Sequence, residues 1–269
     1  MKIVRLLTNY DNYIWVIEAT DGSRKAWVVD PTESLPVIKH FEQYNLKLSG
    51  ILITHHHYDH TAGVEHLIAT LGKVAIISNK RGPFKQVSQH VEEGDFIAVA
   101  GEKFKVLSIP GHSQEHLAFY HPKALFCGDV LFTAGCGKSW CQSAKPMAES
   151  LLKLRALDDD CWVYCGHEYT YGNINFAAIV EPNNVKIKER QKLVAEKTRA
   201  GIPCVPEKLS VEKETNPFLR FDLPELKNTL INKKQQFENF ALTDSANFYA
   251  TLRAWKDSLD KTGELEKGL

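Results

Sequence analysis

The stretch THHHYDH, residues 54–60, concentrates side chains that bind metal ions or move protons. On an extended chain successive side chains point to opposite faces, so His55 and His57 should share one face while His56 and Tyr58 share the other. The next two donors continue into the turn that opens a helix. We therefore expect four side chains to converge on one small volume, namely His55, His57, Asp59 and His60.

Three later segments share a second pattern, in which an apolar strand runs to a glycine that is followed by a possible ligand. They are LSIPGH, LFCGD and VYCGH, which end at His112, Asp129 and His167. Glycine permits the tight turn or close approach that directs the next side chain off the end of a strand. Layered α/β folds place their chemistry at such strand ends. One histidine in this position would usually be an ordinary polar residue, but the repetition favours a site.

The two patterns together supply five imidazoles and two carboxylates. This number exceeds the four positions of one tetrahedral ion and suits two ions that share a bridging carboxylate. We predict two divalent metal ions, with zinc expected first and iron or manganese as alternatives, because such ligands discriminate little among these metals. The predicted ligands are His55, His57, Asp59, His60, His112, Asp129 and His167. The other histidines are expected on the surface or beside a ligand: His40, His56, His66, His90, His116 and His121.

Composition argues against several other classes of protein. The 269 residues contain 33 Lys plus Arg and 33 Asp plus Glu, so the basic excess typical of nucleic-acid-binding proteins is lacking. Hydrophobic residues make up 43% and charged residues 25%, as in ordinary globular proteins. No signal peptide and no apolar stretch of bilayer-spanning length is evident. We expect a soluble, monomeric, cytoplasmic protein whose partner is a small molecule and not nucleic acid or a membrane.

The six cysteines contain no C-x-x-C pair of the kind that marks a zinc ribbon or a thioredoxin-like site. In a reducing compartment such residues are usually small buried apolar side chains, and we expect this for all six. Cys136 and Cys141 flank a loop that is considered below.

Strand and helix signals alternate up to about residue 171, and helical signals dominate afterwards. The sequence therefore predicts a domain over 1–171 and a smaller helical domain over 172–269. Strands are expected at 2–8, 13–19, 25–30, 51–54, 73–78, 95–100, 103–109, 117–121, 124–132 and 162–165, the second and third joined through an Asp-Gly turn at 21–23. Helices are expected at 35–44, 62–72, 146–157, 173–181, 183–201, 224–237 and 245–261.

The motif THHHYDH, followed in order by the three later ligands, resembles the T-H-x-H-x-D-H signature of the metallo-β-lactamase fold over about residues 1–170. The resemblance implies a four-layered αββα sandwich. It also implies one metal on His55, His57 and His112, a second on Asp59, His60 and His167, and Asp129 between them. Asp30, in VVDPT, falls where the family has an aspartate that supports a metal ligand.

Four further features are similar to the glyoxalase II, or hydroxyacylglutathione hydrolase, family within that fold. They are the GCGK loop at 135–138, the GHEYT and ETNPFLR segments, and the helical carboxy-terminal part. With them the resemblance covers nearly the whole chain. It implies that the glutathione moiety is held by Lys138, Tyr169, Arg253 and Lys256.

The expected last helix carries two neighbouring stripes of side chains. One stripe is apolar, and the other contains Tyr249, Arg253 and Lys256, so one can pack while the other faces a ligand. The alternative is an ordinary solvated basic edge.

The chain also departs from the family pattern. Its loop reads GCGKSWCQS, so Trp140 stands where a tyrosine is often found and the usual acidic residue is lacking. The usual threonines around PGH are also replaced, because this chain has SIPGHSQEH. A substrate contact from Trp140, and the effect of the altered loop at 136–143, are left open.

The reaction implied is hydrolysis of S-(2-hydroxyacyl)glutathione, such as S-D-lactoylglutathione, the second step of methylglyoxal detoxification. A hydroxide bridging two metals would be the nucleophile, with Asp59 and Asp129 as the carboxylates of the catalytic centre. Three alternatives stay open at this point: a persulfide dioxygenase with one iron, another thioester or ester hydrolase of the same fold, and a metal-stabilised binding module that is not an enzyme.

Overall fold

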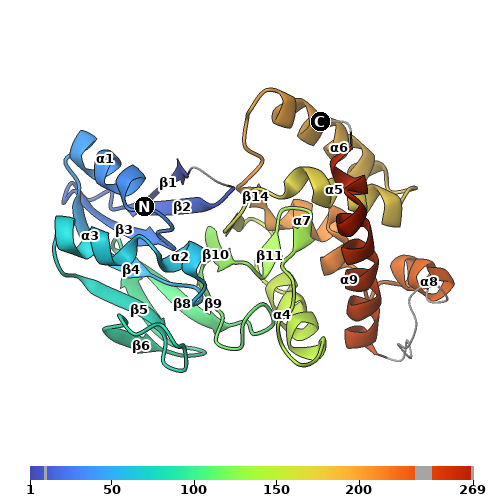
Figure 1. Ribbon diagram of the computed structural model, residues 1–269, viewed down its shortest axis with the longest axis horizontal. Coiled ribbons are helices and arrows are strands. Elements are labelled where there is room, and N and C mark those ends of the chain that lie inside the picture. Colours follow the sequence, from blue (N-terminus) through green and yellow to red (C-terminus); the bar gives the residue numbers. More distant parts are fainter. Residues whose placement is uncertain (9–10, 234–243, 268–269) are drawn as a thin grey trace. The chain divides into compact units, whose positions relative to one another are not determined.

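The computed structural model describes residues 1–8, 11–233 and 244–267, which form two compact units (Figure 1). The first unit contains Met1–Ser108, Glu115–Gly128 and Tyr164–His167. The second contains Ile109–Gln114, Asp129–Val163 and Glu168–Leu269. The predicted domain boundary at residue 171 stays a prediction.

The first sheet has six strands, in blue and cyan in Figure 1, whose spatial order follows the sequence. They are β1 (Lys2–Leu7), β2 (Tyr13–Glu18), β3 (Lys25–Val29), β4 (Lys47–Leu52), β5 (Ala75–Asn79) and β6 (Gln89–Val91). The first three are antiparallel neighbours, and the Asp21 carboxylate accepts a hydrogen bond from the Ser23 backbone N–H in the expected turn. From β3 to β6 the neighbours are parallel. Parallel neighbours need crossover connections, and helices supply two of them.

These crossovers contain α1 (Leu35–Gln43), the short α2 (Tyr58–Thr61) and α3 (Val64–Leu71). The buried faces of α1 and α3 share one apolar core with this sheet, in which Phe41 and Leu67 pack with Val28 and Ile51. On β2 every residue is buried. Trp15 packs edge-on against Tyr164 at 4.9 Å between ring centroids and donates its indole N–H to the Cys165 carbonyl. This contact joins the first sheet to a strand of the second.

The second sheet has the order β14-β13-β10-β9-β8-β7. Its strands are β7 (Phe96–Val99), β8 (Glu102–Ser108), β9 (Leu117–His121), β10 (Ala124–Gly128), β13 (Trp162–Cys165) and β14 (Glu207–Lys208). The sequence did not predict β6 or β14, because two or three residues are too few to show a period. Among the described residues after 171, β14 is the exception to the helical pattern.

The second unit is mainly helical. Its helices are α4 (Lys145–Arg155), α5 (Thr170–Val180), α6 (Val185–Arg199), α7 (Leu209–Thr215), α8 (Pro224–Lys233) and α9 (Ser245–Thr262), with short 3₁₀ turns at Pro217–Leu219 and Glu264–Glu266. A two-stranded hairpin, β11 (Leu131–Phe132) and β12 (Gly135–Cys136), belongs to the same unit. The expected helix 224–237 reaches Lys233, and residues 234–237 lie outside the described residues.

Helix starts in this unit follow capping chemistry. The Asn184 side chain accepts hydrogen bonds from two backbone N–H groups at the start of α6. The Asp244 side chain accepts one from the Asn247 backbone N–H at the start of α9. The α5–α6 pair then buries Ile174 and Ile187 in a common cluster. In the part of the chain that is described, no helix is both long and apolar enough to cross a membrane.

All six cysteines are free thiols. Five are buried, as expected, whereas Cys141 is half-buried. Burial raises the pKa of Cys136 to about 11 and that of Cys204 to about 11, so both thiols stay protonated at neutral pH.

Candidate active site

The histidine-rich segment is not a strand. The expectation that strand alternation places His55 and His57 on one face was therefore wrong about the element. β4 ends at Leu52 and α2 begins at Tyr58, so His55 and His57 lie in the turn between them, whereas Asp59 and His60 lie in α2 itself. His55 Nε2 and His57 Nδ1 nevertheless lie 3.0 Å apart, while Tyr58 is 82% exposed. The turn therefore brings the two imidazoles together by a route other than strand alternation.

Asp30 supports this turn from the end of β3. Its carboxylate accepts from the Thr54 backbone N–H at 2.8 Å and from the Thr54 hydroxyl at 2.6 Å, and it lies 3.1 Å from His60 Nδ1. Asp30 has a φ of 48°, a conformation that typically costs a non-glycine residue about 1–3 kcal/mol. The contact with His60 matches the supporting role that the sequence predicts for Asp30.

Four of the predicted imidazole ligands have the Nδ1 atom occupied by a neighbouring protein group. The partners are Thr54 Oγ1 for His55, Asp30 Oδ2 for His60, the Lys138 carbonyl for His112 and Asp11 Oδ1 for His167, at 2.9–3.1 Å. A carboxylate or carbonyl partner requires the ring N–H on Nδ1, which places the lone pair of a neutral imidazole on Nε2. Such outer partners fix the orientation of metal-binding histidines.

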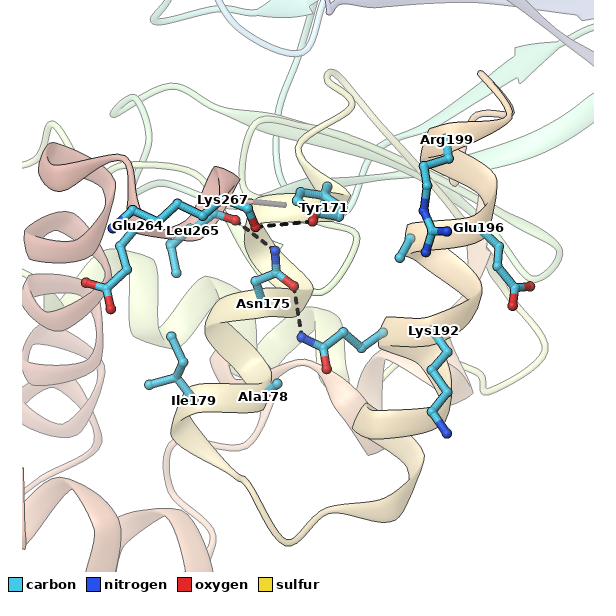
Figure 2. A pocket seen from close by; sticks show the side chains of 12 residues that line it. Tyr171, Asn175, Ala178, Ile179, Lys192, Glu196, Arg199, Glu264, Leu265 and Lys267 are labelled. Atoms are coloured by element: carbon cyan, nitrogen blue, oxygen red, sulfur yellow. Dashed lines mark hydrogen bonds between the residues drawn. The ribbon is translucent and has the colours of Figure 1, made fainter. Parts of the chain in front are cut away.

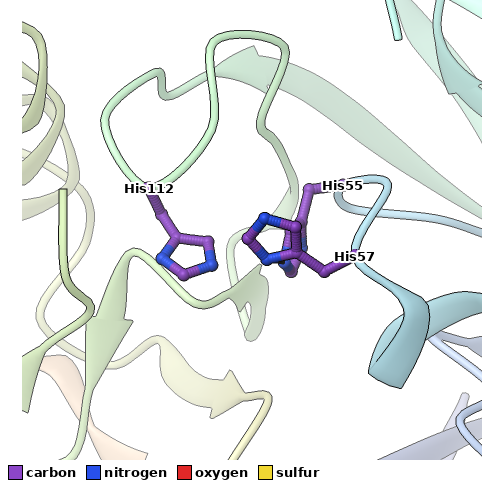
Figure 3. Close-up of side chains that lie close together, drawn as sticks. All are labelled: His55, His57 and His112. Atoms are coloured by element: carbon purple, nitrogen blue, oxygen red, sulfur yellow. Dashed lines mark hydrogen bonds between the residues drawn. The ribbon is translucent and has the colours of Figure 1, made fainter. Parts of the chain in front are cut away.

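The predicted ligands fall into two groups, in each of which one donor atom per residue lies within 4.8 Å of the others. The first, shown in Figure 3, is His55, His57 and His112. The second is Asp59, His60, Asp129 and His167. The family resemblance implies the same division, with Asp129 assigned to both metals; the assignment of each ligand to a metal and the bridging role of Asp129 stay predictions.

The separations within the second group, and between Asp129 and His112 of the first group, suit metal ligands. Asp59 Oδ2 lies 3.6 Å from His60 Nε2 and 3.4 Å from His167 Nε2, and Asp129 Oδ2 lies 3.7 Å from His112 Nε2. The separations of 3.6 and 3.7 Å are too long for hydrogen bonds. Two ligands of a tetrahedral ion with bonds of about 2.1 Å lie about 3.4 Å apart. The donor chemistry and the spacing therefore both fit divalent metal ions.

Two glycines next to the donors permit close approaches. A Cβ on Gly128, where φ is +48°, would lie 2.4 Å from the Thr54 hydroxyl, and one on Gly137 would lie 1.9 Å from the Asp129 carbonyl. Gly128 ends β10 directly before Asp129, as the Gly-ligand pattern predicted. The pattern was wrong for His112 in one respect, because β8 already ends at Ser108.

Three of the four predicted substrate residues lie at the β11–β12 hairpin. Lys138 follows β12, and the Tyr169 ring packs on Phe132 of β11 at 5.2 Å between centroids. Arg253 of α9 donates to the Cys136 carbonyl at 3.4 Å. Three of the four residues are thus tied to one small element of the second unit.

Arg253 and Lys256 are each only 7% exposed, so the alternative of a solvated basic edge on α9 is wrong. Arg253 forms hydrogen bonds to Asp257 at 2.7 and 3.0 Å and to Asp260 at 3.1 Å. Lys256 binds both oxygens of Asp260, at 2.9 and 3.1 Å. Burial and then the neighbouring Arg253 hold the pKa of Lys256 below its ordinary value.

Sequence reasoning missed these two carboxylates. Their positions, four residues after Arg253 and four after Lys256, are the helical spacing at which opposite charges meet, and this signal was available in the sequence.

The altered loop at 136–143 is bonded to the segment that carries His112. The backbone N–H of Trp140 and the hydroxyl of Ser139 both donate to the Gly111 carbonyl at 3.1 Å. The Trp140 side chain itself is 68% exposed. The loop therefore contributes backbone contacts to the site region whatever the role of the indole.

A separate groove of about 610 Å³ lies between α5, α6 and the last described residues (Figure 2). Its polar groups bond to one another: Asn175 donates to the Leu265 carbonyl and accepts from Gln191, and the Tyr171 hydroxyl donates to the Lys267 carbonyl. None of its lining residues is a predicted ligand or substrate residue.

Comparisons with known proteins agree with this arrangement. Residues 7–167 match the family model of the metallo-beta-lactamase superfamily, and residues 168–259 match the model of the hydroxyacylglutathione hydrolase C-terminus. A hydroxyacylglutathione hydrolase of Hydrogenovibrio crunogenus is 56% identical over 270 residues, which cover 100% of this chain and 99% of the relative. The chain belongs to the hydroxyacylglutathione hydrolase family.

A second hydroxyacylglutathione hydrolase, from Pseudoalteromonas translucida, is 40% identical over 86% of this chain and 92% of that relative. Among solved structures, the ETHE1 protein of Myxococcus xanthus has a TM-score of 0.64 at 22% identity, covering 96% of this chain and 99% of that one. The predicted metallo-β-lactamase fold with a helical carboxy-terminal region is thereby confirmed, as is the predicted family.

Proposed function

We propose that this member of the hydroxyacylglutathione hydrolase family hydrolyses the thioester of S-(2-hydroxyacyl)glutathione, such as S-D-lactoylglutathione, to glutathione and a 2-hydroxy acid. The reaction would be the second step of methylglyoxal detoxification, carried out by a cytoplasmic monomer. The observation that carries the proposal is the pair of donor groups, each within 4.8 Å, in a chain whose full length matches a hydroxyacylglutathione hydrolase.

Two divalent ions fit the donor set, with zinc as the first candidate and iron or manganese as alternatives. His55, His57 and His112 would hold one, Asp59, His60 and His167 the other, and Asp129 both. When bound, such ions lower the pKa of water from 15.7 to roughly 7 and polarise a carbonyl oxygen.

The chain's own residues would fix the tautomer of three of the proposed ligands. With Nδ1 engaged by neighbours, His60, His112 and His167 present only Nε2 to the centre. They act as oriented ligands, and Asp59 and Asp129 supply the negative charge that favours cations. The leaving thiol has an ordinary pKa of about 8.5, so its thiolate departs without a strong general acid.

Substrate recognition would come from the second unit. Glutathione carries two carboxylates, and Lys138, Arg253 and Lys256 supply complementary charge, with the planar guanidinium suited to a two-point grip. The Tyr169 ring is positioned by Phe132, and its hydroxyl completes the proposed contacts. At 140 the indole presents an apolar surface in place of a phenol hydroxyl.

The test combines elemental analysis of the purified protein with a panel of glutathione and coenzyme A thioesters. We expect two metal ions per chain, faster turnover of glutathione thioesters, and loss of turnover after chelation that returns with added metal. One iron per chain with oxygen consumption would indicate a persulfide dioxygenase instead. Metal binding without any hydrolysis would indicate a binding module, and full turnover by metal-free protein would refute the mechanism.

A further inference from the structure

The backbone between two proposed ligands, His55 and His57, lies outside any sheet ladder. It follows β4, which ends at Leu52, and precedes α2. Its conformation therefore depends on contacts with other parts of the chain. Thr54 donates its backbone N–H and its hydroxyl to the Asp30 carboxylate. The residue in the middle of the segment, His56, belongs to neither donor group, although its ring lies edge-on to that of His57 at 4.9 Å between centroids.

Glu115 anchors His56. One of its carboxylate oxygens lies 2.5 Å from His56 Nδ1 and accepts from the His56 backbone N–H at 3.3 Å. The Glu115 side chain is buried, and its backbone carbonyl accepts from the Asn79 amide at 2.7 Å, at the end of β5. The anchor is itself held in place by the sheet.

The two residues that follow Glu115 brace the same segment. The His116 ring is fully buried and stacks on His55, with ring centroids 4.5 Å apart and 19° between planes. The Leu117 backbone N–H donates to the Thr54 carbonyl at 2.9 Å. Residues 115–117 thus contact the backbone before His55, the ring of His55 and the backbone after it.

We propose that Glu115, acting through His56, is a positioning residue for the ligands His55 and His57. The inference rests on the metal site of the proposed function. In the described part of the chain Glu115 does not belong to either donor group, so its influence on a metal would be indirect. Partners that orient metal ligands typically change metal affinity by about 10- to 100-fold when they are removed.

The experiment compares metal affinity in Glu115→Ala, Glu115→Gln and His56→Ala with that of the parent protein, by competition against a chromogenic chelator with Zn²⁺ as the probe. The absorption spectrum of the Co²⁺-substituted protein reports ligand geometry independently of activity. Glu92→Ala is the matched control, because Glu92 is an exposed glutamate that pairs with Lys80.

We expect Glu115→Ala to bind Zn²⁺ about 10- to 100-fold more weakly and to alter the Co²⁺ spectrum. Glu115→Gln should retain most of the affinity, because its amide oxygen can accept the same two hydrogen bonds, and Glu92→Ala should match the parent. An unchanged affinity and spectrum in Glu115→Ala would overturn the proposal. If circular dichroism shows that Glu115→Ala does not fold, the test uses His56→Ala, because the His56 ring is partly exposed and its removal should be tolerated. A Zn²⁺ affinity of His56→Ala equal to that of the parent would also overturn the proposal.

Turnover of glutathione thioesters, measured at equal metal content, separates this inference from the proposed function. A parent protein that binds two metals but hydrolyses no thioester would refute the function alone. The effect of Glu115 on Zn²⁺ affinity would still be judged on its own measurement.

Discussion

The metal-ligand candidates and the cation cluster of α9 are both largely buried sets of ionisable groups, but their charges are balanced differently. The ligand set consists of imidazoles and the carboxylates Asp59 and Asp129, so it contains no lysine or arginine. In the α9 cluster, Arg253 and Lys256 are matched by Asp257 and Asp260 on the same helix. The first set needs cations from outside the chain, whereas the second is already neutral.

This difference has a consequence for ligand binding. Metal ions entering the donor groups would relieve an unbalanced negative charge, which is a favourable change in a buried site. A substrate carboxylate approaching α9 would instead compete with Asp260 for the same N–H groups. We therefore expect substitutions of the ligand set to abolish function and substitutions of the α9 carboxylates to tune it.

The largest effect is expected from Asp129→Ala. Loss of the proposed bridging carboxylate should lower the metal content and reduce kcat for a glutathione thioester by about a thousandfold, since metal stabilisation of the transition state amounts to several kcal/mol. Elemental analysis and steady-state kinetics measure both changes. Asp160→Ala is the control, because its side chain is 92% exposed. Parent-like kinetics in Asp129→Ala would remove the basis for treating the ligand set as essential.

Arg253→Ala should act on binding. A hydrogen bond to a charged group is worth about 1.5–3 kcal/mol, so KM should rise about 10- to 100-fold while kcat changes far less. The control is Arg155→Ala, which removes a half-buried arginine that also pairs with a carboxylate, Asp222, in the same unit. A KM equal to that of the parent would show that Arg253 serves only to hold the Cys136 carbonyl.

Asp260→Asn tests the competition directly. Without this carboxylate Lys256 loses its internal partner, and glutathione should bind up to about fivefold more tightly, the range of a partly exposed ion pair. Inhibition by free glutathione measures the change, with Asp159→Asn, whose carboxylate pairs with Lys213, as the control. Weaker binding in Asp260→Asn would mean that Asp260 orients the cations for the ligand.

The smallest effect is expected on stability alone. It involves the ion pair of Arg155 and Asp222, which belongs to neither the ligand set nor the α9 cluster. Burial raises the pKa of Asp222, but the hydrogen bonds and charge of Arg155 outweigh it and hold that pKa below its ordinary value of 3.8. A carboxylate with a lowered folded-state pKa stabilises the fold above its unfolded pKa, and this contribution is lost as the pH falls through the folded value. Asp222→Asn should lower Tm by about 2–4 °C at pH 7, the shift that about 1 kcal/mol produces.

At a pH below the lowered folded-state pKa of Asp222, the parent and Asp222→Asn should melt alike, because both then lack the charge. Thermal melts at the two pH values measure this, and KM should be unchanged at pH 7. An equal Tm difference at both pH values would contradict an ionic origin.

The sequence patterns alone predicted the seven donors, because ligands on one short segment, or next to a glycine that the backbone needs, are recognisable locally, whereas family resemblance implied their division into two groups. Gly128 before Asp129 is such a case. The alternation argument for His55 and His57 predicted the outcome but not the element, since the segment proved to be a turn held by Asp30. Family resemblance supplied the substrate residues, and their roles stay a prediction.

Other features were decided only by tertiary structure. The burial of Arg253 and Lys256 depends on what packs over α9, and the pairing of Glu115 with His56 joins residues 59 positions apart. Neither leaves a periodic signal, because a long-range contact depends on where the intervening strands and helices bring the chain. The sequence by itself therefore determined which chemistry the chain carries, and the fold decided which of its charged groups hold that chemistry in place.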